Sequence, residues 1–282
     1  MPMFARALTL TVALLLPGLA RAADVTVMTS GGFQSTCEAL APGFERATGN
    51  HIVMVLGASM GATAEAIPSR LARGEPDDVL IMVGYALDGL IKSGKAVANS
   101  KVDVARSVIG MAVRAGAPVP DIATADKLRQ VLLAAKSVAY SDSASGVYIQ
   151  NEMFKKLGID AAMQGKAHMI PGTPVGEIVA RGEAEVGFQQ VAELLPVAGI
   201  TFVGTIPDAV QLVTVYSAAV ATDSKHPDEA RKLIAYFTSP EAADARFTAS
   251  MQHRKRSRQR MNGCELMFSS SLVKSRPPRR AS

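Results

Sequence analysis

The sequence predicts an α/β fold built around largely parallel sheets, and two observations support this. Short apolar runs alternate with segments of helical periodicity between residues 23 and 250, an order typical of strands separated by helices. Glycines stand where most of the expected helices should end, and glycine readily takes the left-handed backbone of a helix terminus. This body is long enough for two small lobes or for one large domain.

Apolar runs between turn residues mark the candidate strands, which are Val25–Thr29, His51–Leu56, Val79–Val83, Val108–Val113, Ser137–Tyr140, Ala167–Ile170, Val186–Gln189, Thr201–Val203 and Leu212–Ala221. Helical periodicity marks the candidate helices, which are Gln34–Thr48, Ala62–Arg73, Ala86–Ser93, Ala125–Ala135, Gly146–Leu157, Val175–Arg181 and Pro227–Thr238. Thr124 precedes the fourth helix as a capping residue. We expect the chain to cross between two lobes near Ala105 and again near Val210.

The first 22 residues predict a cleavable secretory signal. Arg6 gives a short basic start, residues 7–16 are apolar, and Ala20 and Ala22 are the small residues that a signal peptidase reads. This apolar run is too short for a transmembrane span. We therefore expect a periplasmic protein that begins near Ala23 and is not inserted into the membrane.

The formal net charge of +5 comes from the end of the chain. Residues 251–282 hold nine Lys/Arg and one acidic residue, whereas residues 23–250 hold 19 basic against 24 acidic residues. We expect the tail to be disordered, because it has neither helical nor strand periodicity. Such a tail could bind nucleic acid or an anionic membrane. The composition changes abruptly at Ser250, as a shifted reading frame would produce, so we infer no function and no nucleic-acid partner from it.

Several chemistries lack their sequence signatures. No phosphate-binding loop, dinucleotide fingerprint or Gly-x-Ser-x-Gly elbow occurs. The histidines of the body, His51, His168 and His226, stand singly, which predicts neither a metal centre nor a Ser/His/Asp triad. We expect no cofactor and no metal. Cys37 is interpreted as a packed thiol on the first helix.

Serine and glycine recur where a strand gives way to a helix, and these corners predict an anion site. The positions are Ser30, Gly31 and Gly32, then Ser59, Met60 and Gly61, and later Ser141, Ser143, Ser145 and Gly146. Each corner can offer hydroxyls and unpaired N–H groups at a helix start, where the helix dipole also favours negative charge. Each serine could instead only cap its own helix.

These corners, together with the pattern His226-Pro-Asp-Glu-Ala-Arg followed by Ser239-Pro-Glu-Ala-Ala, resemble type II periplasmic solute-binding proteins, and the molybdate-binding branch in particular. The resemblance implies two α/β lobes with two hinge crossings, one lobe formed by residues 23–105 and 211–250 and the other by 106–210. It implies a small anionic ligand and, as a partner, an ABC transporter permease. The implied ligand residues are the three corners, with Gly84, Gln189 and Tyr216.

Some segments depart from the molybdate-binding pattern and are instead similar to aconitate isomerases, enzymes of the same fold. These segments are 70–76, 139–148, 179–184 and 187–190. The second resemblance implies a cofactor-free enzyme that moves a proton between carbons of an unsaturated tricarboxylate.

Two functions therefore stay open. A binding protein needs only complementary donors, whereas an isomerase needs a base and cationic or amide groups that hold carboxylates. Arg73 and Arg181, each at a helix end, are possible carboxylate ligands, although the helix dipole alone would favour them there. The side-chain types suited to a base are Tyr140, Asp142, Tyr148 and Glu177. We favour the binding protein, because the residues do not identify the catalytic pair.

Overall fold

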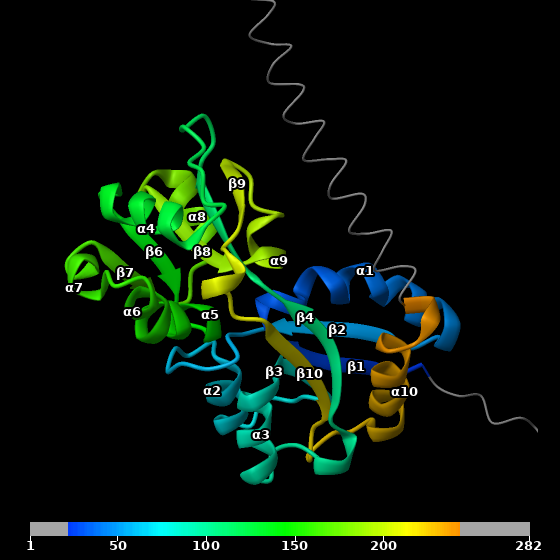
Figure 1. Ribbon diagram of the computed structural model, residues 1–282. Coiled ribbons are helices and arrows are strands. Elements are labelled where there is room, and N and C mark those ends of the chain that lie inside the picture. Colours follow the sequence, from blue (N-terminus) through cyan, green and yellow to red (C-terminus); the bar gives the residue numbers. More distant parts are fainter. Residues whose placement is uncertain (1–21, 243–282) are drawn as a thin grey trace, which may run out of the picture.

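The computed structural model describes residues 22–242. The expected signal and the basic tail with Cys264 lie outside them. Two five-stranded sheets, each flanked by helices, form two lobes (Figure 1), so the two-lobed α/β fold is confirmed. No helix in this described range is long and apolar enough to cross a membrane.

The first sheet has the strand order β2-β1-β3-β10-β4. Its strands are β1 (Asp24–Thr29), β2 (His51–Leu56), β3 (Val79–Val83), β4 (Val102–Ser107) and β10 (Thr214–Val220). β1 runs parallel to β2 and β3, while β10 runs antiparallel to β3 and β4. The register pairs Tyr216 with Val83, so the start of β10 lies at the edge where β1 and β3 end.

The second sheet has the order β7-β6-β8-β5-β9. Its strands are β5 (Ile109–Arg114), β6 (Val138–Ser141), β7 (Ala167–Ile170), β8 (Val186–Gln190) and β9 (Ile200–Thr205). β6 is parallel to β7 and β8, whereas β5 is antiparallel to β8 and β9. The start of β5, at Ile109, therefore pairs with Gln190 at the end of β8.

The expectation of largely parallel sheets is wrong in this respect. Four strand pairs are parallel and four are antiparallel within residues 22–242. The antiparallel partners include β5 and β10, the strands by which the chain enters the second sheet and returns to the first. β4 was not predicted, because Asp103 and Arg106 interrupt its apolar pattern.

The expected helices occur in the expected order, the one at Val175–Arg181 with the predicted bounds, whereas the short helices Asp160–Met163 and Val191–Leu194 were not predicted. The helices are α1 (Gly31–Thr48), α2 (Ile67–Ala72), α3 (Gly84–Lys92), α4 (Ala125–Ala134), α5 (Ala144–Tyr148), α6 (Phe154–Lys156), α7 (Asp160–Met163), α8 (Val175–Arg181), α9 (Val191–Leu194) and α10 (Pro227–Phe237). The helix expected over 62–73 begins only at Ile67, because residues 59–65 form turns. The one expected over 146–157 starts at Ala144 and contains a π-helical stretch, Ile149–Met153, between α5 and α6.

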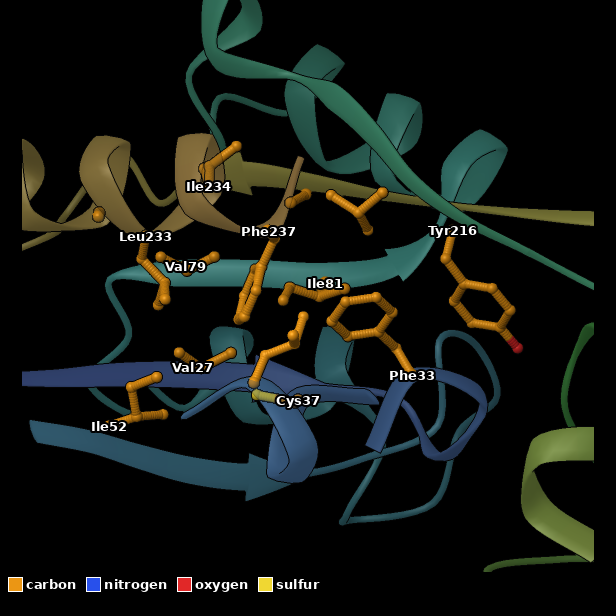
Figure 2. Packing of buried hydrophobic residues seen from close by; sticks show 14 of the residues in the cluster. Val27, Phe33, Cys37, Ile52, Val79, Ile81, Tyr216, Leu233, Ile234 and Phe237 are labelled. Carbon is orange, nitrogen blue, oxygen red and sulfur yellow. The ribbon is translucent and has the colours of Figure 1, made fainter. Parts of the chain in front are cut away.

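Each face of the first sheet has its own core. One core packs α1 and α10 on the sheet through Phe33 and Phe237, whose rings meet edge to face at 5.5 Å (Figure 2), and another packs α2 and α3 on the opposite face. Cys37 is buried in the first core, and burial raises the pKa of its thiol to about 12. The expectation of a packed thiol on the first helix is confirmed.

Gln211 fixes the returning crossing to the second lobe. Its Oε1 accepts from the Ile109 N–H at 2.8 Å, and its Nε2 donates to the carbonyls of Ile109 and Ile206. These bonds hold the segment that leads into β10 beside the start of β5. The carboxyl edges of the parallel strands in the two sheets are thereby brought toward each other, the usual place of ligand sites in open α/β sheets.

Candidate functional site

Several contacts join the two lobes at the facing sheet edges. Gln190 Nε2 donates to Thr214 Oγ1 at 2.9 Å. The Glu193 carboxyl, on α9, lies against Gly31 at the start of α1. A Cβ on Gly61 would stand 3.7 Å from the Asp142 carbonyl. The first and second corners of lobe one therefore meet lobe two directly.

Ser30 supplies an unsatisfied hydroxyl at the start of an 18-residue helix. It is the N-cap of α1, yet its side chain makes no capping hydrogen bond. Ser30 Oγ is buried and has no hydrogen-bond partner among the described residues. Because an unpaired buried polar atom is costly, this hydroxyl is suited to a ligand. Ser30 therefore occupies the N-cap position of α1 without capping the helix through its side chain.

Tyr216 covers the next residues of the same helix start. A Cβ on Gly32 would overlap the Tyr216 hydroxyl, so only glycine leaves room for the ring, which Figure 2 shows beside Phe33. Burial, together with the charge of Glu193, raises the pKa of Tyr216 well above its usual value. Interaction with the Ser30 side chain lowers this pKa by a smaller amount. Tyr216 is therefore a neutral hydroxyl donor.

Ser59 lies beside this helix start, at the end of the same sheet. Its side chain is fully buried, and Oγ accepts from the Val83 N–H at 3.1 Å. Val83 pairs with Tyr216, which places Ser59 near the tyrosine. The N-cap of α2 is Ala66, so Ser59 caps no helix. Its hydroxyl hydrogen can point to a ligand.

The other members of the second corner have different surroundings. Met60 Sδ accepts a weak hydrogen bond from the Tyr85 hydroxyl at 3.8 Å. Gly61 has φ +103°, a conformation that favours glycine. Gly84 packs against Ser217, where a Cβ would come within 2.8 Å of Oγ. The absence of a side chain at Gly84 therefore lets the start of α3 pack closely against β10.

The third corner belongs to lobe two. Ser141 Oγ and Ser145 Oγ are both buried and lie 3.1 Å apart. A Cβ on Gly146 would collide with the Ser141 carbonyl, so a side chain there would push α5 off β6. Ser143 is the half-buried N-cap of α5 and makes no capping bond. Ala144 packs in the core that contains Tyr216, which puts this corner against lobe one.

Glu193 is the functional candidate that sequence reasoning missed. It is half-buried and receives a hydrogen bond from Gln189 Nε2 at 3.0 Å. Burial, reinforced by the charge of Asp142, raises the pKa of Glu193 to about 7, against the lowering effect of the hydrogen bonds from Gln189 and the Gln190 backbone. The sequence signal available was weak: a Glu four residues after Gln189 in a short helix.

The two expected arginine ligands do not join this set. Arg73 pairs with Glu75 at 2.6 Å and ends α2 near Asp77 and Asp78, which precede β3. Arg181 pairs with Glu183 at 2.5 Å and with Glu177 at 3.6 Å. It ends α8, whose other end, at Val175, contacts Gln189. Local acidic partners hold both arginines away from the facing edges.

Three of the four base candidates are occupied elsewhere. The Tyr148 hydroxyl donates to the Val210 carbonyl at 2.8 Å, the Tyr140 hydroxyl donates to Gln150 Oε1 at 3.4 Å, and Glu177 is the exposed partner of Arg181. Asp142 lies at the site, but its Oδ2 accepts from the Gly172 N–H at 3.3 Å. Asp142 does not cap α5, whose N-cap is Ser143.

The assembled side chains combine hydrogen-bond donors with one carboxyl that changes charge near neutral pH. Ser30, Ser59 and Tyr216 offer hydroxyls, and the start of α1 offers backbone N–H groups and its dipole. Glu193 can take or give a proton under physiological conditions. Within residues 22–242, no three His, Cys, Asp or Glu side chains form a group able to hold a metal ion.

Comparisons with known proteins agree with this arrangement. The family model for bacterial extracellular solute-binding proteins matches residues 25–246. An aconitate isomerase from Pseudomonas sp. is 51% identical over 221 residues, which cover 78% of this chain and 84% of that protein. The resemblances found in the sequence are confirmed.

Solved structures share the fold at low identity. The periplasmic molybdate-binding protein of Azotobacter vinelandii superposes with a TM-score of 0.64 at 19% identity, covering 80% of this chain and 97% of that one. The sulfate-binding protein SubI of Mycobacterium tuberculosis H37Rv gives a TM-score of 0.65 at 20% identity, covering 81% and 85%. At these identities the likeness concerns the fold alone.

Proposed function

The chain belongs to the family of bacterial extracellular solute-binding proteins, and we propose that within this family it is an aconitate isomerase. It would interconvert cis- and trans-aconitate without a cofactor, in the periplasm after removal of residues 1–22. The observation that carries this proposal is the Glu193 carboxyl, which lies at the meeting point of the lobes with a pKa raised to about 7. The 51% identity to an aconitate isomerase supports it independently.

The reaction is a proton shift along three carbons. The Glu193 carboxylate takes a proton from the substrate methylene, so a C–H bond breaks and an O–H bond forms. The electron pair left behind spreads over the adjacent double bond and carboxylate. Glu193 then returns the proton to the far carbon of the former double bond, which leaves the double bond one position along the chain. No oxidant or reductant is required.

The hydroxyl and amide donors suit the charge that develops in this reaction. Ser30, Ser59 and Tyr216 are buried at the sheet edge beside the start of α1, and we propose that their hydroxyls donate to substrate carboxylates there. Preorganised donors stabilise a developing oxyanion more strongly than water does. A carboxyl whose pKa lies near the working pH is the most efficient proton carrier.

The test is incubation of the purified protein with cis-aconitate between about pH 6 and 9, with chromatographic detection of trans-aconitate. We expect conversion, and in D₂O we expect solvent deuterium in the product when the proton on Glu193 exchanges before it returns. No trans-aconitate at any of these pH values would overturn the proposal. Isomerisation that needs an added redox reagent would also contradict it.

A transport-linked binding protein for a small oxyanion or carboxylate is the second candidate. The observation that favours it is that Arg73 and Arg181, the cations expected to neutralise a tricarboxylate, are paired with glutamates elsewhere. A tetrahedral oxyanion requires fewer positive charges. Calorimetric titration with molybdate, sulfate and citrate-like acids separates the two: tight molybdate or sulfate binding without turnover would support delivery to an ABC transporter permease.

A further inference from the structure

We propose that Gln189 is a positioning residue that locks the carboxyl of Glu193 in a single orientation against the start of α1. Gln189 was expected to bind the ligand, but both ends of its amide are engaged by the protein. The inference rests on the proposed function only in giving Glu193 the proton transfer. The hydrogen bond by which Gln189 orients Glu193 is present in the protein without a ligand.

One backbone donor decides which way the Gln189 amide faces. The Val175 N–H, at the start of α8, lies 2.9 Å from one end of the amide. An N–H can only donate, so this end must be the oxygen. The NH₂ group is therefore turned to Glu193, whose Oε1 lies 3.0 Å away. The reverse orientation would set two donors against each other.

Gln189, which orients the Glu193 carboxyl, is itself held in place by the second sheet. Gln189 is buried in β8, and its backbone lies opposite Gly110 in the sheet. The same carboxyl oxygen of Glu193 that accepts from Gln189 is also the atom lying on Gly31. The Gln189 hydrogen bond therefore decides where Glu193 Oε1 stands relative to the donors of lobe one.

The charges around Glu193 make this donor important. Asp142, after β6, raises the pKa of Glu193, and Tyr216 on β10 faces it as a neutral hydroxyl. The first turn of α1 carries no acidic residue, and Glu177 on α8 is paired with Arg181. A hydrogen bond to a carboxylate favours its charged form. Gln189 thus keeps the base ionisable in an acidic, half-buried setting.

The sharpest variant is Gln189→Glu, which keeps the shape and the acceptor for Val175 but removes the donor. We expect the rising limb of kcat/KM against pH to move upward by about one unit or more, because two carboxyls at this distance share a proton. The matched control is Gln130→Glu, which makes the same substitution at an exposed residue of α4, outside the candidate site. The control should leave the profile unchanged.

Two measurements keep the test independent of turnover. In the wild-type protein, the side-chain NH₂ resonances of Gln189 should titrate with the same midpoint as the ¹³C carboxyl resonance of Glu193. In Gln189→Leu, that midpoint should rise. Unchanged NH₂ shifts across the titration, or an unchanged Glu193 midpoint in either folded variant, would overturn the lock. A protein that shows the shared titration but makes no trans-aconitate would overturn the proposed function instead.

Discussion

Glu193 of the second lobe rests on Gly31 of the first, and a side chain at position 31 would collide with its carboxyl. The contact sets a group whose pKa is raised to about 7 against the start of a helix whose dipole attracts negative charge. It also joins the lobes through the residue proposed to carry the proton. A substrate carboxylate that binds at this helix start must share it with Glu193.

Replacement of Glu193 by glutamine should remove the proton carrier and leave the donors in place. General acid–base catalysis contributes about 10²- to 10⁴-fold to rates, so kcat for cis-aconitate should fall by that range with little change in affinity. The matched control is Glu183→Gln, which alters an exposed ion pair with Arg181. Wild-type kcat in Glu193→Gln would show that another group moves the proton.

Stability should depend on pH through Asp77, on the far side of the first lobe from the site. Burial raises the pKa of Asp77 from 3.8 to about 6, and Asp78 and Asp223 add to this rise. The folded state therefore holds a proton that the unfolded state releases, so stability falls as pH rises from about 4 to 6. In Asp77→Asn this loss should disappear. Above pH 6, Asp77→Asn should therefore be more stable than the wild type by on the order of 2 kcal/mol. Denaturant unfolding of both proteins at pH 4 and pH 7 measures this difference.

Ser30→Ala should weaken ligand binding without lowering the stability of the free protein. Ser30 Oγ has no partner at hydrogen-bonding distance and only a side-chain interaction with Tyr216, whereas a hydrogen bond to a charged ligand is worth about 1.5–3 kcal/mol, or roughly 10- to 150-fold in affinity. Calorimetry with the bound acid measures the first effect and thermal unfolding the second. Ser93→Ala, which removes a bond to the Leu90 carbonyl on exposed α3, should leave the affinity unchanged. A large fall in the melting temperature of Ser30→Ala would contradict this prediction.

Gly32→Ala should destabilise the packing around Tyr216 and disturb the candidate site at the start of α1. Its Cβ would overlap the buried Tyr216 ring, and overpacking of this kind costs about 1–3 kcal/mol. The control is Gly89→Ala on α3, where nothing lies within 4 Å of the new Cβ and the helix should gain up to about 1 kcal/mol. Urea unfolding of the two variants checks the opposite signs. Equal stability of both variants would mean that Tyr216 moves aside freely.

Local patterns were enough to find the parallel strands and the serine-glycine corners. Short segments rich in apolar and β-branched residues before Ser30 and Ser141, each followed by turn residues and a helical pattern, are typical of buried strands. The resemblance to solute-binding proteins then supplied the two lobes and the place of Tyr216. β4 was not predicted, because it is an edge strand whose charged residues interrupt the apolar pattern.

The side chain proposed as the base could not be identified from the sequence. Glu193 stands in a four-residue helix without a motif, and nothing local distinguishes it from Glu183 or Glu185. From the sequence, Arg73 and Arg181 were equally plausible carboxylate ligands. In the structure, nearby glutamates form ion pairs with both. The sequence by itself indicated the α/β class and the serine-glycine corners, because these depend on local periodicity and on glycine. Only the tertiary structure distinguished the carboxyl proposed as the base, because desolvation and contact across the lobes raise its pKa.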